Sequence, residues 1–200
     1  EDGVTVEFWL KKDSWQTSNT DNINKTAIFD LWNGEITGST SGGTTSDRSQ
    51  YGRLLLFLSA SGHGDSGAQP FGIHLASGST VWDARLGASL TTSSIEGNWE
   101  HFAFTFQSSS ADNTLKARLY RSGSFIEEVS SGDIGTFNEV TGSLVAHLGA
   151  LQTTPSGNAF QLYVYPSTTY KGYGGLEASI DEFRYWKTAR NGEEIGLNYF

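Results

Sequence analysis

Short segments in which apolar and polar residues alternate recur along the whole chain, separated by turn-forming residues. Residues 3–11 place an apolar residue at every second position, which is the period of a half-buried strand. Residues 53–59 are apolar on both faces, so we expect a central strand there. Further strands are expected at 27–32, 71–75, 81–86, 99–107, 115–120, 125–129, 144–151, 160–165 and 180–186. About a dozen short strands with turns between them predict an all-β fold, a two-sheet antiparallel β-sandwich of jelly-roll type.

The chain closes with a strand followed by a short helix. Gly174 and Gly175 precede the strand, and Asn191 follows it with Glu194 three residues later. This is the spacing of a capping box, in which each side chain bonds the other residue's backbone N–H. We therefore predict one short C-terminal helix that begins after Asn191.

Asp181 is the most informative residue of this closing segment. Strict alternation places Asp181 on the same face as Phe183 and Tyr185, and two aromatic residues make that face the core side. A carboxylate among aromatic residues is costly unless it finds hydrogen bonds, a cation or a metal. Three roles follow: a carboxylate that fixes a loop or the other end of the chain, a calcium ligand, or a catalytic acid.

Charge and composition exclude several classes of partner. The formal net charge is -9 and there is no cysteine, and no basic run is longer than Lys11-Lys12. Nucleic acid and anionic membranes require a basic stripe, so neither is expected as a partner. A disulfide framework is impossible, and no apolar run reaches the length of about 18 residues that a membrane span needs. Because residue 1 is Glu, we expect a piece of a longer or processed chain.

The sequence lacks the patterns of catalysis. Glycosidases need two carboxylates that flank one bond, whereas the adjacent pairs Glu127-Glu128 and Asp181-Glu182 point to opposite faces of a strand. The string at 64–67 (Gly-Asp-Ser-Gly) superficially matches a serine-protease nucleophile, but that chemistry needs a His base and a buried Asp upstream. The only upstream His is His63, which is nearly adjacent, so we interpret the string as a turn. The 4 histidines show no paired metal-ligand spacing. We predict that the chain is not an enzyme.

Aromatic residues at loops and loop edges make carbohydrate the favoured ligand. Sugars stack their C–H faces on aromatic rings and hydrogen-bond to polar side chains, and such sites lie on loops of a rigid scaffold. The segment 165–173 holds three tyrosines in a polar loop. The predicted ligand-binding residues are Tyr165, Tyr170, Tyr173, Trp82 and Trp32. For each of them, ordinary packing under a loop is the alternative.

Four stretches, in order, resemble laminin-G-like domains of the concanavalin A-like lectin/glucanase superfamily. They are Val4 to Lys11, Asn98 to Phe106 with its Trp-x-His-hydrophobic-Ala pattern, the hairpin Leu115 to Gly123, and the closing Ile-Asp-Glu-Phe-Arg-Tyr-Trp of residues 180–186. The resemblance implies one jelly-roll domain over residues 1–200 that lacks the family's usual opening strand, so we expect another segment or chain to supply it. This superfamily hosts many functions, so the resemblance does not identify the ligand.

The resemblance also implies calcium. Many laminin-G-like domains bind this ion at the rim through an Asp side chain, and Asp181 lies in the matching signature. Calcium takes about six to eight oxygens, so Asp181 needs co-ligands. The candidates are Glu1, Asp2, Asp21, Asp30 and Asp133.

Together these observations predict a non-catalytic recognition or adhesion module that binds carbohydrate or glycoprotein. We expect it outside the cell, on a bacterial surface or a virion surface. The alternative is a structural decoration or assembly domain that packs on neighbouring subunits and binds no sugar. An aromatic-lined polar groove would favour the first hypothesis, and an exposed apolar patch the second.

Overall fold

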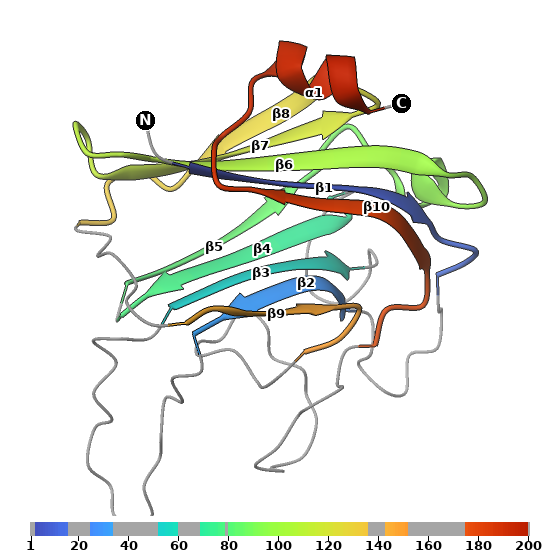
Figure 1. Ribbon diagram of the computed structural model, residues 1–200, viewed down its shortest axis with the longest axis horizontal. Helices are drawn as coiled ribbons and strands as arrows, with labels where there is room; N and C mark the ends of the chain where they lie inside the picture. Colours follow the sequence, from blue (N-terminus) through green and yellow to red (C-terminus); the bar gives the residue numbers. More distant parts are fainter. Residues whose placement is uncertain are drawn as a thin grey trace, which may run out of the picture.

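The computed structural model describes residues 3–15, 25–33, 52–59, 69–78, 80–135, 143–151 and 175–199. In this part of the chain, two antiparallel sheets of five strands each face one another (Figure 1). The predicted all-β sandwich is therefore confirmed. The predicted strand 160–165 and the tyrosine-bearing segment 165–173 lie outside the described residues, as does most of each long loop.

The first sheet joins the two ends of the chain. Its strand order is β10-β1-β6-β7-β8. The bounds are β1 (Gly3–Lys11), β6 (Glu100–Ser109), β7 (Thr114–Arg121), β8 (Ser124–Ser130) and β10 (Ser179–Trp186). The short helices η1 (Thr92–Ile95) and α1 (Gly192–Asn198) accompany it, and α1 lies on its outer side (Figure 1).

The second sheet has the order β5-β4-β3-β2-β9. The bounds are β2 (Lys25–Trp32), β3 (Gly52–Ser59), β4 (Phe71–Ser77), β5 (Thr80–Leu86) and β9 (Val145–Leu148). Every residue of β3 is buried, as the uninterrupted apolar run of residues 53–59 predicts for a central strand. Gly72 on β4 gives room to the ring of Phe57, because a Cβ at Gly72 would lie 2.1 Å from that ring's Cζ.

Aromatic side chains fill the space between the sheets. The ring of Phe71, from the second sheet, packs edge-on against Phe102 and Phe104 of the first, with ring centroids 4.8 and 5.0 Å apart. Phe8 stacks on Phe104 at 5.9 Å. Each fully buried side chain of this kind contributes about 1.5–3 kcal/mol to folding, so this cluster holds the two layers together.

Helix α1 forms as the capping-box spacing predicts. The Asn191 side chain accepts a hydrogen bond from Glu194 N, and the Glu194 carboxylate accepts one from Asn191 N. Ile195 is fully buried against Ala103 and Tyr120 on the outer face of the first sheet. The helix therefore adds a local third layer over that face.

A β-bulge in β10 overturns the predicted orientation of Asp181. Glu7 pairs with Arg184, but Trp9 pairs with Asp181, so two residues of β10 lie opposite one residue of β1. The extra residue, Glu182, has a φ of 50°. Because a bulge shifts the alternation by one position, Phe183 still packs against the core whereas Asp181 is exposed. The prediction that Asp181 points inward is wrong for this reason.

Among the described residues, no helix is long and apolar enough to cross a membrane.

Candidate functional site

Two of the predicted ligand-binding aromatic residues are buried in the structure. Trp82 is 8% exposed and belongs to the core between the sheets, because it pairs with Leu75 on the inward face of β5 and β4. Trp32 lies on the outer face of the second sheet but is 6% exposed, packed beside Ala76 and Val81. Trp82 therefore lies within a strand and not at a loop edge, whereas Trp32 ends β2 at a loop edge but is buried. Tyr165, Tyr170 and Tyr173 lie outside the described residues.

Within the described ranges, Asp181 belongs to no cluster of acidic side chains. Oδ1 of Asp181 accepts a hydrogen bond from Glu182 N at 2.8 Å. Of the candidate co-ligands, Asp30 is fully buried and pairs with Arg53, and Asp133 accepts from Gly135 N. In the described ranges, no group of three or more His, Cys, Asp or Glu side chains could hold a metal. Calcium at Asp181 stays a prediction from the resemblance.

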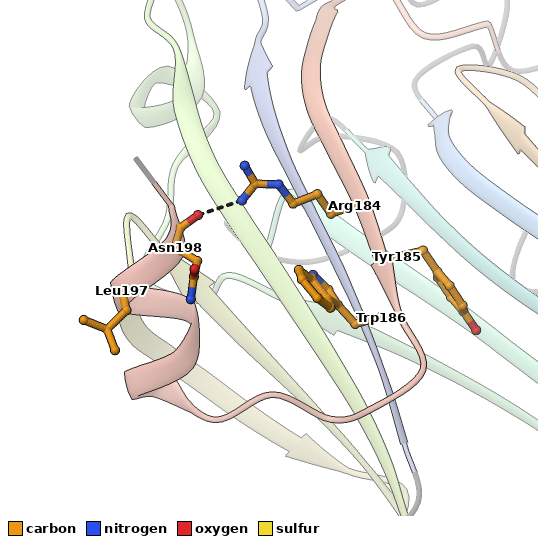
Figure 2. Close-up of a pocket in the computed structure, with 5 residues that line it drawn as sticks. All are labelled: Arg184, Tyr185, Trp186, Leu197 and Asn198. Carbon is orange, nitrogen blue, oxygen red and sulfur yellow. Dashed lines mark hydrogen bonds between the residues drawn. The ribbon is translucent and has the colours of Figure 1, made fainter.

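A pocket lies between β10 and α1, over the outer face of the first sheet. Its volume is about 510 Å³, within the range of small-ligand sites. The lining residues are Arg184, Tyr185, Trp186, Leu197 and Asn198. Figure 2 shows Arg184 and Trp186 on the helix side of β10, while Tyr185 extends to the other side of the strand. A strand and a helix thus border one open surface that is both aromatic and polar.

Arg184 connects the two walls. Its Nη1 donates to the backbone oxygen of Asn198 at 2.6 Å, and its Nη2 donates to Oε2 of Glu182 at 2.6 Å. A cation at the last turn of a helix also complements the negative end of the helix dipole. The side chain is 31% exposed, and a guanidinium has more N–H donors than these two bonds use. Arg184 is therefore fixed in position and still able to donate to a ligand.

Trp186 supplies the exposed aromatic surface of the pocket. It is 39% exposed, and the guanidinium carbon of Arg190 lies 4.6 Å from its ring centroid. This cation–π contact holds the indole in place. Leu197, at 76% exposure, adds an apolar surface on the helix side.

A buried polar layer beneath the pocket holds both walls. Arg190 forms an ion pair with Glu7, and both side chains are almost completely buried. Arg190 also donates to the carbonyl of Glu194 in α1. Its backbone N–H donates to Thr5 Oγ1, which donates in turn to Thr188 O. These bonds join β1 to the segment between β10 and α1, and so they set the position of the helix wall.

His101 lies in the same layer. Its ring contacts Trp9 and Tyr199, with centroids 5.7 and 5.5 Å apart. Burial, followed by the charges of Arg184 and Arg190, lowers the pKa of His101 to about 4. The imidazole is therefore neutral at physiological pH, which fits a structural role.

A second polar group lies on the outer face of the second sheet. Nδ1 of His74 is 2.7 Å from Oδ1 of Asp83, and His74 is buried. Arg85, on the same face of β5, donates to Gln69 O at 2.7 Å. His74 is thus held by Asp83 and Arg85 by a backbone carbonyl, so we interpret them as structural.

Sequence reasoning missed the pocket although it singled out the segment that builds it. Alternation along residues 183–186 puts Arg184 and Trp186 on the face opposite Phe183, as the structure does. The available signal was an arginine and a tryptophan two residues apart, followed by a capped helix. Only the fold shows that this helix returns over the same face.

Comparison with known proteins supports the fold. The chain matches no protein-family model and no curated protein. Among solved structures, it is similar to the CBM40 domain of Ruminococcus gnavus IT-sialidase bound to α2,3-sialyllactose. The TM-score is 0.50 with 14% identity, over 98% of this chain and 82% of that one.

Two further structures share the architecture but are much longer. One is the mouse laminin α1 chain, domains LG4-5, with a TM-score of 0.50 and 12% identity over 96% of this chain and 37% of that one. The other is leech intramolecular trans-sialidase complexed with 2,7-anhydro-Neu5Ac. It has a TM-score of 0.50 and 16% identity over 100% of this chain and 24% of that one. At these identities the likeness is one of fold, and it supports the β-sandwich that the resemblance to laminin-G-like domains implied.

Proposed function

We propose that this chain is a non-catalytic carbohydrate-binding domain and that the pocket between β10 and α1 is its sugar-binding site. The observation that carries the proposal is the exposed indole of Trp186 beside the fixed guanidinium of Arg184. Aromatic rings offer an apolar surface to the C–H face of a sugar, while a few placed polar groups set its orientation. The sugar-bound structures with the same fold support the proposal as analogy.

The pocket suits binding better than catalysis. None of its five lining residues is Asp or Glu, whereas hydrolysis of a glycosidic bond uses two carboxyl groups on either side of that bond. Glu182 reaches the rim as the partner of Arg184, but it is a single carboxylate. We therefore propose recognition without turnover. Its setting would be outside the cell, on a bacterial or virion surface, where glycans are accessible partners.

The test compares two exposed tryptophans. Trp186→Ala removes the aromatic surface of the pocket, and Trp99→Ala removes an indole that is 44% exposed and does not line it. Both proteins and the wild type are applied to a glycan array, and hits are measured by isothermal titration calorimetry. We expect Trp186→Ala to lose at least about tenfold in affinity, or about 1.4 kcal/mol, and Trp99→Ala to bind normally. The proposal is overturned if the Trp186→Ala variant binds the glycan as tightly as the wild type does, or if the wild type binds no glycan.

One observation favours the alternative of an assembly domain. Among the described strands, β9 is an edge of the second sheet. Val145 and Leu148 on β9 are 42% and 50% exposed, and Leu144 just before it is 48% exposed. Exposed apolar residues on an edge strand can pair with another subunit. Sedimentation velocity of the wild type and of Val145→Lys tests this function: assembly requires a concentration-dependent oligomer that the lysine abolishes.

A further inference from the structure

We infer that the pocket selects a neutral, hydroxyl-rich sugar and discriminates against sugars that carry a carboxylate. This inference rests on the proposed function, and it concerns the class of sugar bound at the same site. It follows from the way in which the charge of Arg184 is already neutralised.

Arg184 and Glu182 present a donor and an acceptor side by side. Nη2 of Arg184 lies 2.6 Å from Oε2 of Glu182, and the two side chains are 31% and 56% exposed. Within the described residues, Oε2 makes this bond and Oε1 makes none. A sugar hydroxyl both donates and accepts a hydrogen bond, so neighbouring hydroxyls can accept from the guanidinium and donate to the carboxylate at once. A ligand carboxylate can only accept.

The charges around the pocket also oppose an anion. The bond to Glu182 neutralises Arg184, and Nη1 of Arg184 binds the carbonyl of Asn198 at the negative end of α1. Arg190 is neutralised by the buried Glu7. A ligand carboxylate at Arg184 would therefore lie beside the Glu182 carboxylate and helix carbonyls, in a chain whose net charge is -9. Like charges at such short range repel, and part burial weakens the screening.

Lys187 is the remaining cation near this strand end. It is exposed, and it forms no ion pair with any residue in the described ranges. The first turn of α1 also carries two carboxylates, Glu193 and Glu194. The charges around the pocket therefore do not create an anion site. Analogy with the similar CBM40 domain, which was solved with a sialylated ligand, would suggest the opposite.

The experiment compares ligands that differ only in the carboxylate. Methyl glycosides of common hexoses and of the matching hexuronic acids are titrated into the wild type, and neutral and sialylated forms of the same oligosaccharides are compared on an array. We expect the neutral member of the preferred pair to bind at least about tenfold more tightly. Glu182→Gln keeps the size of the side chain and removes its charge, so its affinity for the acidic member should rise at least about fivefold.

Glu128→Gln is the matched control. Glu128 accepts from Arg118 at 2.6 Å, as Glu182 does from Arg184, but on β8 and away from the pocket. Its substitution changes the net charge by the same amount, and we expect no change in the preference between the two ligands. If Glu128→Gln and Glu182→Gln raise acidic-sugar binding equally, the effect is one of net charge and the inference fails.

The outcomes separate the inference from the proposed function. Tighter binding of the acidic member, abolished by Trp186→Ala, would overturn the inference and leave the sugar-binding site in place. The absence of binding to either member, or binding that Trp186→Ala does not affect, would overturn the proposed function itself. A neutral preference that Glu182→Gln leaves unchanged would also refute the inference, because the carboxylate would then have no part in selection.

Discussion

The buried ion pair between Glu7 and Arg190 predicts a large loss of stability when one partner is removed. Arg190→Ala leaves the Glu7 carboxylate, which is 0% exposed, without a cation. Its Oε2 already lacks a partner, so the variant buries a charge that nothing compensates. Breaking such a pair costs about 3–5 kcal/mol, and loss of the contact with Trp186 adds roughly 0.5–2 kcal/mol. We expect a total loss of about 3.5–7 kcal/mol, against a stability of about 5–15 kcal/mol for a typical domain.

Urea unfolding followed by tryptophan fluorescence measures this loss. The matched control is Arg118→Ala, whose partner Glu128 lies at a normal distance of 2.6 Å but with the two side chains 29% and 35% exposed. Exposed pairs contribute about 0–1 kcal/mol. A double-mutant cycle with Glu7→Ala should show a coupling energy of about 1 kcal/mol or more. If Arg190→Ala and Arg118→Ala cost the same, or if the cycle shows no coupling, the reasoning from burial is refuted.

Two further predictions concern stability. Gly72→Ala places a Cβ 2.1 Å from Cζ of Phe57 and should lower the free energy of unfolding by about 1–3 kcal/mol in a urea titration. Gly175→Ala is the control, because a Cβ there has nothing within 4 Å. It should change the free energy of unfolding by no more than about 0.5 kcal/mol. The pKa of His101, about 4 in the folded chain against a usual 6.5, means that the unfolded chain takes up the proton first. The stability that neutral, buried His101 contributes to the folded chain is therefore complete above pH 6.5 and is lost as the pH falls towards 4. Between pH 6.5 and 4, the melting temperature should fall less steeply with pH for His101→Phe than for the wild type. Equal slopes for the two proteins would contradict the burial assigned to His101.

Alternation along the strands was sufficient to predict the architecture. It identified β3 as central because residues 53–59 are apolar on both faces, and it placed Phe183 and Tyr185 towards the core. It failed at Asp181 because a bulge leaves no mark in the hydrophobic pattern: Glu182 adopts its φ of 50° in response to the register with β1. Local pattern thus predicts which residues form strands, but pairing between distant strands decides where the alternation shifts.

The site was harder to predict for a related reason. Glu7 has the position of a surface residue in an alternating strand, yet it is fully buried because Arg190, far away in the sequence, packs over it. Tryptophan is a residue type that often binds sugars, yet Trp82 lies on the inward face of β5 and packs in the core. The pocket itself combines Trp186 on β10 with Leu197 on α1, and no spacing rule connects a strand to the helix that folds back over it.

The bulge in β10 also affects how copies of this chain meet one another. Among the described strands, β10 pairs only with β1, so its other edge is open. A regular open edge is a template on which another strand can grow. Here the irregular backbone at Glu182 interrupts the row of donors and acceptors, and the Asp181 side chain takes up one backbone N–H itself. Two exposed carboxylates stand at the same point, so the feature that misled the sequence prediction is also a safeguard against edge-to-edge aggregation.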